Sequence, residues 1–506
     1  MQQVERTMRS EYGEYLGRRE SIVLAQREWE ATPLRARISV IARLRQRMAL
    51  GARELAETVP TDLPGGLHRT VADTLGSEIV PLLAACRFVE REAGRILKTK
   101  RLGRGGRPIW LTGVQTEVER AALGVVLVVG AGNYPLLLAG VQTIQALAAG
   151  NAVLWKPAPG TAAAADALRV LLVECGLNPD LLTLLDTDVE SVSEAIAAGV
   201  DHVVLTGSAQ TGKAVMRQLA ETLTPATMEL SGCDAVFVLP GTELDHMVRA
   251  IGFGLRFNGS FTCMAPRRVF LVGFSEAETA EVEARLSAAA RELAPVPLPA
   301  KTEELLRALI ADARDQGAEI ALDGLSPDGL VDREDSLGAG ATFGATLIYR
   351  ATPSMRAMQA DIFAPVLSVM RTGDLGEALA ANAACPYALT AAVFGPEREA
   401  RKLAGWLRVG NVLINDIVVP TVDPRVAFGG RGRSGFGVTR GAEGLLAMTT
   451  PRTVQVQHMR IPFPYEATGD GHVGLFAGLA KMLYGHGIGN RWDGLKGLVR
   501  AAKRLK

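Results

Sequence analysis

Apolar residues in the first hundred positions recur at intervals of three and four, which is the spacing of one helix face. Residues 34–55 are rich in Ala, Leu and Arg, and residues 71–97 repeat the pattern. The break between these two predicted helices contains Pro60, Pro64, Gly65 and Gly66. No residue pattern here indicates chemistry, so we interpret the region as helices packed around a later sheet.

Short apolar runs alternate with helical segments after residue 123. Residues 124–130, GVVLVVG, form a Val-rich run between glycines that is typical of a strand buried on both faces of a parallel sheet. Further strands are predicted at 152–155, 182–185 and 202–205, with helices at 136–149 and 161–175. This alternation predicts a doubly wound α/β domain.

A second alternating block runs from residue 227 to about residue 414. It contains predicted helices at 245–257 and 276–293 and a predicted strand at 268–272. The glycine-rich run FGGRGRSGFG at 428–437 is predicted to be a loop. The fold class is therefore α/β throughout.

Composition narrows the function classes. The chain has 506 residues, and its 55 Lys and Arg nearly balance 54 Asp and Glu, so charge gives no case for nucleic-acid binding. Its length indicates two or three domains, and its five widely spaced cysteines suit a reducing compartment. The charged N-terminus does not match a secretory signal, and no apolar run reaches the roughly 18 residues of a membrane span. We expect a cytoplasmic protein.

Two positions are candidates for binding a nucleotide. Residues 207–212, GSAQTG, follow a predicted strand and open a helix, where backbone N–H groups face an anion such as a pyrophosphate. A plain strand-to-helix connection is the alternative, and no Lys-Ser or Lys-Thr pair follows Gly212 to make a P-loop. Lys156 ends the second strand at the sheet edge where such folds bind ligands, with a solvated lysine as the alternative.

Two further residues are candidates for catalysis. Cys263 follows a predicted helix in NGSFTC, and the nearby Arg267 and Arg268 are expected to favour its reactive thiolate. An inert buried cysteine is the alternative. Glu229 lies between apolar residues in MELSG, where burial would raise its pKa toward that of a general base working near neutral pH. An exposed or ion-paired strand glutamate is its alternative.

Six runs, in order, together resemble the aldehyde dehydrogenase superfamily over residues 20–457. They are GVVLVVGAGNYPLLLAGVQTIQALAAGNAVLWKP, VVLTGSAQTGKAVM, TPATMELSG, NGSFTCMAPRRV, DIFAPV and FGGRGRSGFG. The NYP, TPATMEL and TCMAP phrases look most like the class 3, fatty-aldehyde branch. The resemblance implies a Rossmann-type cofactor domain, an α/β catalytic domain and a small β oligomerisation flap. The implied boundaries are 1–104 with 121–228, then 229–444, and 105–120 with 445–460 for the flap.

The resemblance also implies a role for each matching residue. Cys263 matches the nucleophile, Glu229 the general base, and Asn133 the amide that stabilises an oxyanion together with the Cys263 N–H. The positions that match the cofactor site are Lys156, Gly207, Ser208, Gly212, Asp361 and Phe363. The implied reaction is oxidation of an aldehyde, long-chain or aromatic, to a carboxylic acid with NAD or NADP through a Cys263 thioester. No metal site is expected.

Several positions depart from the family pattern. Asp361 replaces a glutamate, Phe261 a glutamine, and Gly132 a tryptophan. Pro159 stands where many NAD-preferring members carry an acid, so the choice between NAD and NADP stays open. The alternatives are a nucleotide-binding homologue with little or no activity and a CoA-acylating enzyme; Glu229 argues against the latter, because thiolysis needs no such base.

The C-terminal residues extend beyond the resemblance. TTPRTVQVQ at 449–457 matches a strand that pairs across subunits, so a homodimer or homotetramer is expected. From Lys481 onward there are seven Lys or Arg and one Asp. One helical face is predicted to contain Trp492, Leu495, Leu498, Val499 and Leu505. A basic amphipathic tail at 461–506 suits peripheral contact with an anionic membrane, and packing on the protein itself is the alternative.

Overall fold

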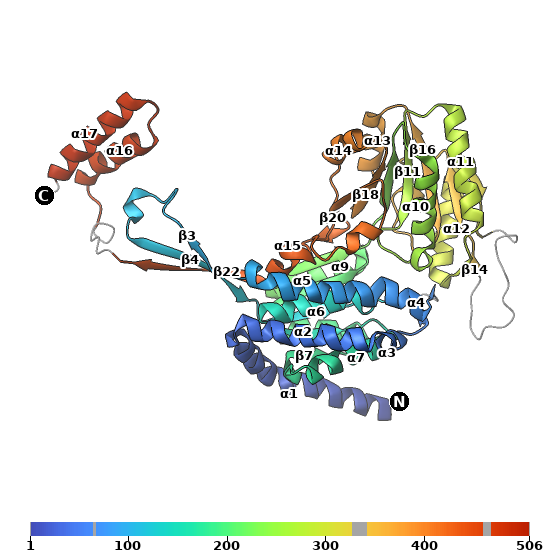
Figure 1. Ribbon diagram of the computed structural model, residues 1–506, viewed down its shortest axis with the longest axis horizontal. Coiled ribbons are helices and arrows are strands. Elements are labelled where there is room, and N and C mark those ends of the chain that lie inside the picture. Colours follow the sequence, from blue (N-terminus) through green and yellow to red (C-terminus); the bar gives the residue numbers. More distant parts are fainter. Residues whose placement is uncertain (1, 64–66, 326–341, 459–466, 505–506) are drawn as a thin grey trace. The chain divides into compact units, whose positions relative to one another are not determined.

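A computed structural model describes residues 2–63, 67–325, 342–458 and 467–504 (Figure 1). The chain divides into two compact units, which are residues 1–99 with 119–452, and residues 100–118 with 453–506. The larger unit contains two mainly parallel sheets with helices packed against them. The predicted α/β class is therefore confirmed.

The first sheet holds the strands predicted before residue 230. Its order is β21 (Gly435–Phe436), β9 (Ala226–Leu230), β8 (His202–Gly207), β5 (Val125–Val129), β6 (Ala152–Lys156) and β7 (Leu182–Leu184). All strands except β21 run parallel. Every residue of β5 and β6 is buried, as the apolar runs predict. Because these strands are parallel, the carboxyl ends of β6 and β8 lie at the same sheet edge.

Helices from the first half of the chain pack with this sheet. They are α2 (Leu34–Leu50), α5 (Val80–Ile96), α6 (Leu137–Ala149), α7 (Ala162–Glu174) and α9 (Ala209–Thr222). α6 is buried along its whole length and contacts α2, α5 and β6. The predicted helix at 34–55 is interrupted at Gly51, and the one at 71–97 consists of α4 (Val71–Thr74), a π turn (Leu75–Ile79) and α5. Of the predicted break between them, residues 64–66 lie outside the described residues.

The second sheet is buried on both faces. Its order is β13 (Glu319–Leu322), β15 (Thr346–Tyr349), β16 (Val366–Thr372), β11 (Pro266–Val272), β10 (Asp234–Val238), β18 (Thr390–Phe394) and β19 (Asn411–Ile414). Alternate residues of β11 enter different cores: Phe270 packs in one cluster, and Val269 and Leu271 in another. α10 (Leu244–Arg256) and α11 (Glu276–Arg291) belong to the second cluster, whereas α13 (Leu375–Ala383) and α14 (Glu397–Ala404) belong to the first (Figure 1).

The strand predicted to pair across subunits has a partner in its own chain. β22 (Thr449–Gln457) pairs with β4 (Val114–Ala122), which pairs with β3 (Lys100–Leu102), so β22 is an edge strand. All its residues after the first are exposed. Its pairing with a second subunit stays a prediction.

The tail forms two packed helices, α16 (Gly471–Tyr484) and α17 (Ile488–Arg504). Glycines let their backbones touch, since a Cβ at Gly478 would lie 2.5 Å from the Leu498 nitrogen. Of the predicted apolar face, Trp492 and Val499 are 57% and 46% exposed, whereas Gly494 and Ala501 are buried. The membrane contact of this face stays a prediction. Leu505 lies outside the described residues. Among the described helices, none has the length and apolarity needed to cross a membrane.

Candidate active site

Cys263 lies between a 3-10 turn (Phe257–Ser260) and β11, in the wall of a cavity of about 160 Å³. The lining consists of Gly76, Ser77, Pro81, Tyr134, Leu137, Leu138, Phe253, Phe257, Thr262, Cys263, Met264, Val418, Val419, Thr421, Val422 and Arg440. Most of these side chains are apolar, and three are aromatic. A cavity of this size holds a group roughly as large as a benzene ring.

The surroundings of Cys263 favour its thiol over its thiolate. Burial and, to a smaller extent, the negative charges of Glu229 and Asp234 raise its pKa to about 12, against a lowering effect of Arg440. Arg267 interacts electrostatically with Cys263, but the net shift of the Cys263 pKa is upward, so the thiolate expected beside the two arginines is not favoured. Both arginine side chains are buried and form hydrogen bonds with other groups. The Arg267 guanidinium donates to the Ser260 hydroxyl and the Ala364 carbonyl, and Arg268 donates to the Cys233 carbonyl.

Glu229 lies on β9 of the first sheet and is 3% exposed. Its Oε2 accepts hydrogen bonds from Gln142 Nε2 at 3.3 Å and Thr439 Oγ1 at 3.0 Å. Its Oε1 has no hydrogen-bond partner among the described residues. Burial raises the pKa of Glu229, while Arg440 and the two hydrogen bonds lower it. One oxygen is thus available to take a proton, and the charge acts on Cys263.

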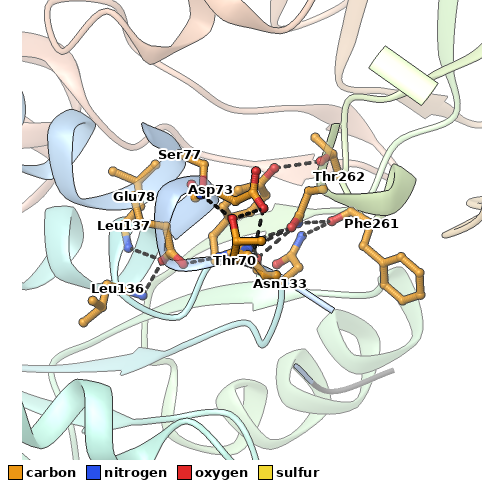
Figure 2. Close-up of polar contacts among 12 residues, drawn as sticks. Thr70, Asp73, Ser77, Glu78, Asn133, Leu136, Leu137, Phe261 and Thr262 are labelled. Atoms are coloured by element: carbon orange, nitrogen blue, oxygen red, sulfur yellow. Dashed lines mark hydrogen bonds and ion pairs between the residues drawn. The ribbon is translucent and has the colours of Figure 1, made fainter. Parts of the chain in front are cut away.

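Asn133 is brought next to the segment that carries Cys263. It lies between β5 and α6, and its Nδ2 donates to the Phe261 carbonyl at 3.0 Å (Figure 2). The hydroxyls of Tyr134 and Thr262 are 2.7 Å apart. The predicted juxtaposition of Asn133 with the residues next to Cys263 is therefore present.

Lys156, Gly207 and Ser208 lie at the carboxyl ends of β6 and β8, which we call the cofactor edge. Ser208 caps α9 by accepting from the Thr211 N–H at 3.1 Å. Lys156 is 7% exposed, and in the described parts of the chain its ammonium forms no ion pair. Burial lowers its pKa, and Asp188 raises it. A buried ammonium at the same sheet edge as a helix N-terminus fits a ligand that supplies hydroxyls and an anionic group.

Gly212 in the first turn of α9 packs closely on β9. A Cβ at this position would lie 2.9 Å from a methyl of Leu230. Its contribution is therefore to let the helix start approach the sheet.

Asp361 and Phe363 are held by neighbours that the sequence did not reveal. The Asp361 oxygens accept from the Ser231 hydroxyl at 2.5 Å and the Tyr387 hydroxyl at 3.0 Å. Phe363 contacts Phe261 edge to face, with ring centroids 6.2 Å apart.

Sequence reasoning also missed Arg69 and Glu78, which lie in the region interpreted only as helical packing. Arg69 is 3% and Glu78 0% exposed, and the two form an ion pair. Arg69 donates to the Asn133 carbonyl. The one available signal was an acid inside the otherwise apolar stretch around Ile79 and Val80.

Comparisons with known proteins match this chain to one family and one fold. The Aldehyde dehydrogenase family model matches residues 20–454. The 4,4'-diapolycopene aldehyde oxidase of Methylomonas sp is 30% identical over 472 residues, which cover 90% of this chain and 84% of the relative. The Mus musculus protein named aldehyde dehydrogenase, dimeric NADP-preferring, is 30% identical over 341 residues, covering 67% and 73%. The crystal structure of a Mycobacterium tuberculosis aldehyde dehydrogenase complexed with NAD+ has the same fold, with a TM-score of 0.73, 24% identity and coverage of 86% and 88%.

Proposed function

The chain belongs to the aldehyde dehydrogenase family, and from that premise we propose that it oxidises an apolar aldehyde, long-chain or aromatic, to the carboxylic acid. NAD or NADP is the cofactor. The observation that carries the substrate class is the cavity beside Cys263, whose lining is mainly apolar and aromatic. Apolar walls with few polar groups select an apolar ligand by burial of its surface.

Each catalytic role is assigned to a residue of the site. The Cys263 thiol releases its proton to water, and the resulting thiolate attacks the aldehyde carbon. The Asn133 amide and the Cys263 N–H hold the oxyanion, each contributing about 3 kcal/mol. The bound nicotinamide supplies the hydride acceptor. The acyl group is then held as a thioester on Cys263, and Glu229 takes a proton from the water that hydrolyses it.

The cofactor residues are assigned in the same way. Lys156 would donate to ribose hydroxyls, and the N-terminus of α9 with Gly207, Ser208 and Gly212 would face the pyrophosphate. Asp361 and Phe363 would lie at the nicotinamide ribose. The hydroxyls of Ser231 and Tyr387 restrict the Asp361 carboxylate, which favours a weak cofactor contact there.

Finer assignments extend this proposal. We assign the chain to the class 3 branch on the NYP, TPATMEL and TCMAP phrases of its sequence. The exposed edge of β22 suits a homodimer contact. The cytoplasmic location, the membrane contact of the tail and the boundaries between cofactor and catalytic domains stay predictions.

The test is NAD(P)H formation from a panel of aldehydes that runs from acetaldehyde to hexadecanal and includes benzaldehyde. We expect kcat/KM to rise with apolar size and turnover to vanish in Cys263→Ala. Absent turnover with either cofactor, despite measurable cofactor binding, would instead favour a nucleotide-binding homologue. A requirement for CoA would favour the acylating alternative.

A further inference from the structure

We propose that Arg69 and Glu78 are positioning residues whose buried ion pair fixes Asn133 against the turn that carries Cys263. Asn133 and residues 258–263 are called here the oxyanion region. This inference rests on the proposed function, because it concerns how the oxyanion of that reaction is held.

Arg69 uses its guanidinium in three directions at once. Nη1 bonds the Glu78 carboxylate, Nη2 the Asn133 carbonyl, and Nε the Asn258 Oδ1 at 3.0 Å. The guanidinium also lies over the Tyr134 ring, 5.1 Å from its centroid. The planar fork of arginine supports this arrangement, whereas a lysine ammonium is a point charge on a flexible stem.

Glu78 fixes the other end of the Asn133 segment. Its second oxygen accepts from the Leu136 N–H at 2.7 Å and the Leu137 N–H at 3.0 Å, at the start of α6 (Figure 2). These N–H groups lack partners within the helix, so the carboxylate supplies their hydrogen-bond acceptor. Its negative charge also interacts favourably with the positive end of the helix dipole. Residues 133–137 are therefore held by Arg69 at the first residue and by Glu78 at the last two.

Asn258 joins this segment to the Cys263 turn. Its backbone is left-handed, with a φ of 53°, a conformation that asparagine adopts more readily than most residues. Its Nδ2 donates to the Asn133 carbonyl at 3.3 Å and to the Phe261 carbonyl at 3.2 Å. The Phe261 carbonyl also takes one of the two N–H groups of the Asn133 amide, which leaves the other for an oxyanion.

Stability alone is a weak reason for this arrangement. A buried ion pair contributes little net stability compared with well-packed apolar side chains of similar volume. The Arg69–Glu78 pair instead fixes the position of Asn133 relative to Cys263. A displacement of about 1 Å of a group that holds a transition state lowers the rate by about a hundredfold.

The test compares two reactions of the same thiol. Acetyl transfer from p-nitrophenyl acetate forms a carbon–sulfur bond through an oxyanion and releases p-nitrophenolate, without any cofactor. Alkylation by iodoacetamide forms a carbon–sulfur bond and releases iodide, without an oxyanion. Both need the thiolate, so their rate ratio cancels any change in its pKa. The Cys263 peptide is followed by mass spectrometry, and Cys263→Ala gives the background.

We expect Arg69→Lys to lower acetyl transfer about 10- to 100-fold while alkylation stays within about threefold. Glu78→Gln keeps an acceptor for the α6 N–H groups and should give a smaller loss in the same ratio. Arg45→Gln removes the part-buried Arg45–Glu90 pair of α2 and α5 and serves as the matched control, with an unchanged ratio. With aldehyde as substrate, kcat should fall and KM stay nearly constant in Arg69→Lys.

An unchanged ratio in both Arg69→Lys and Glu78→Gln would overturn the inference, as would a parallel loss of both reactions. If Arg69→Lys fails to fold, Glu78→Gln decides alone. If the wild-type protein accepts acetyl groups on Cys263 but oxidises no aldehyde, the proposed function is rejected. The ratio of acetyl transfer to alkylation in the variants then still decides the positioning role.

Discussion

The cofactor edge and the oxyanion region are assembled in different ways. At the cofactor edge, Lys156 and Ser208 are each placed by the strand that precedes them, and these strands, β6 and β8, flank β5 in one parallel sheet, so both residues lie at the same edge. In the oxyanion region, Asn133 and Asn258 are positioned by Arg69, which comes from a segment far away in the sequence. We therefore expect changes at the cofactor edge to be nearly additive, and changes in the oxyanion region to be strongly coupled.

The largest expected effect tests whether Glu229 belongs to the reaction or to the sheet on which it lies. Glu229→Gln should lower steady-state turnover about 10²- to 10⁴-fold, because no group remains to deprotonate the hydrolytic water. A single burst of NAD(P)H should persist, since acylation precedes that step. Rapid mixing with excess aldehyde measures both, and loss of the burst would assign Glu229 to activation of the thiol.

The same variant has a pH signature. Because burial raises the pKa of Glu229, wild-type turnover should fall with decreasing pH at values above the ordinary glutamate pKa of 4.5. The carboxyl is protonated below its pKa and then takes no proton from water. Glu229→Gln should lack this acid limb.

An intermediate effect tests the independence of the cofactor edge. Lys156→Met should raise KM for the cofactor about 10- to 100-fold, because one or two hydrogen bonds to charged nitrogen are lost. It should leave kcat and the ratio of acetyl transfer to alkylation at Cys263 unchanged. The exposed Lys402 on α14 provides the control Lys402→Met. A drop in acetyl transfer by Lys156→Met would show that the two regions are coupled.

The smallest effect sharpens the cofactor assignment. Pro159 is exposed and follows the end of β6. Pro159→Glu should lower kcat/KM for NADP about tenfold through repulsion of the 2′-phosphate, with little change for NAD. Pro159→Gln separates this charge effect from the loss of proline, and equal losses with both cofactors would reject the position as a 2′-phosphate neighbour.

The two regions also differ in how well the sequence predicts them. The Val-rich runs predict β5 and β8 because burial on both faces leaves a pattern within a few residues. The Arg69–Glu78 pair leaves no such pattern, since its partners are fixed only by the tertiary fold. The effect of Arg267 and Arg268 is hard to predict for the same reason: the tertiary fold binds their guanidinium groups to Ser260 and to the Cys233 carbonyl, and burial of Cys263 raises its pKa in spite of them.

The contact between the two tail helices is another feature that the pattern of large apolar residues does not predict. In α16 and α17 the contact is made by glycines, whose missing side chains let the backbones meet. Trp492 takes no part in this contact and is exposed.

The Asn258 contacts also bear on when activity first emerges during folding. Asn258 and Arg69 are 189 residues apart in sequence, so closing this loop is a costly, non-local step. The cofactor edge requires pairing only among β5, β6 and β8. A refolding or newly synthesised chain should thus bind nucleotide before its Cys263 thiol can be acylated. The delay between these two activities would measure how long the N-terminal helices take to dock.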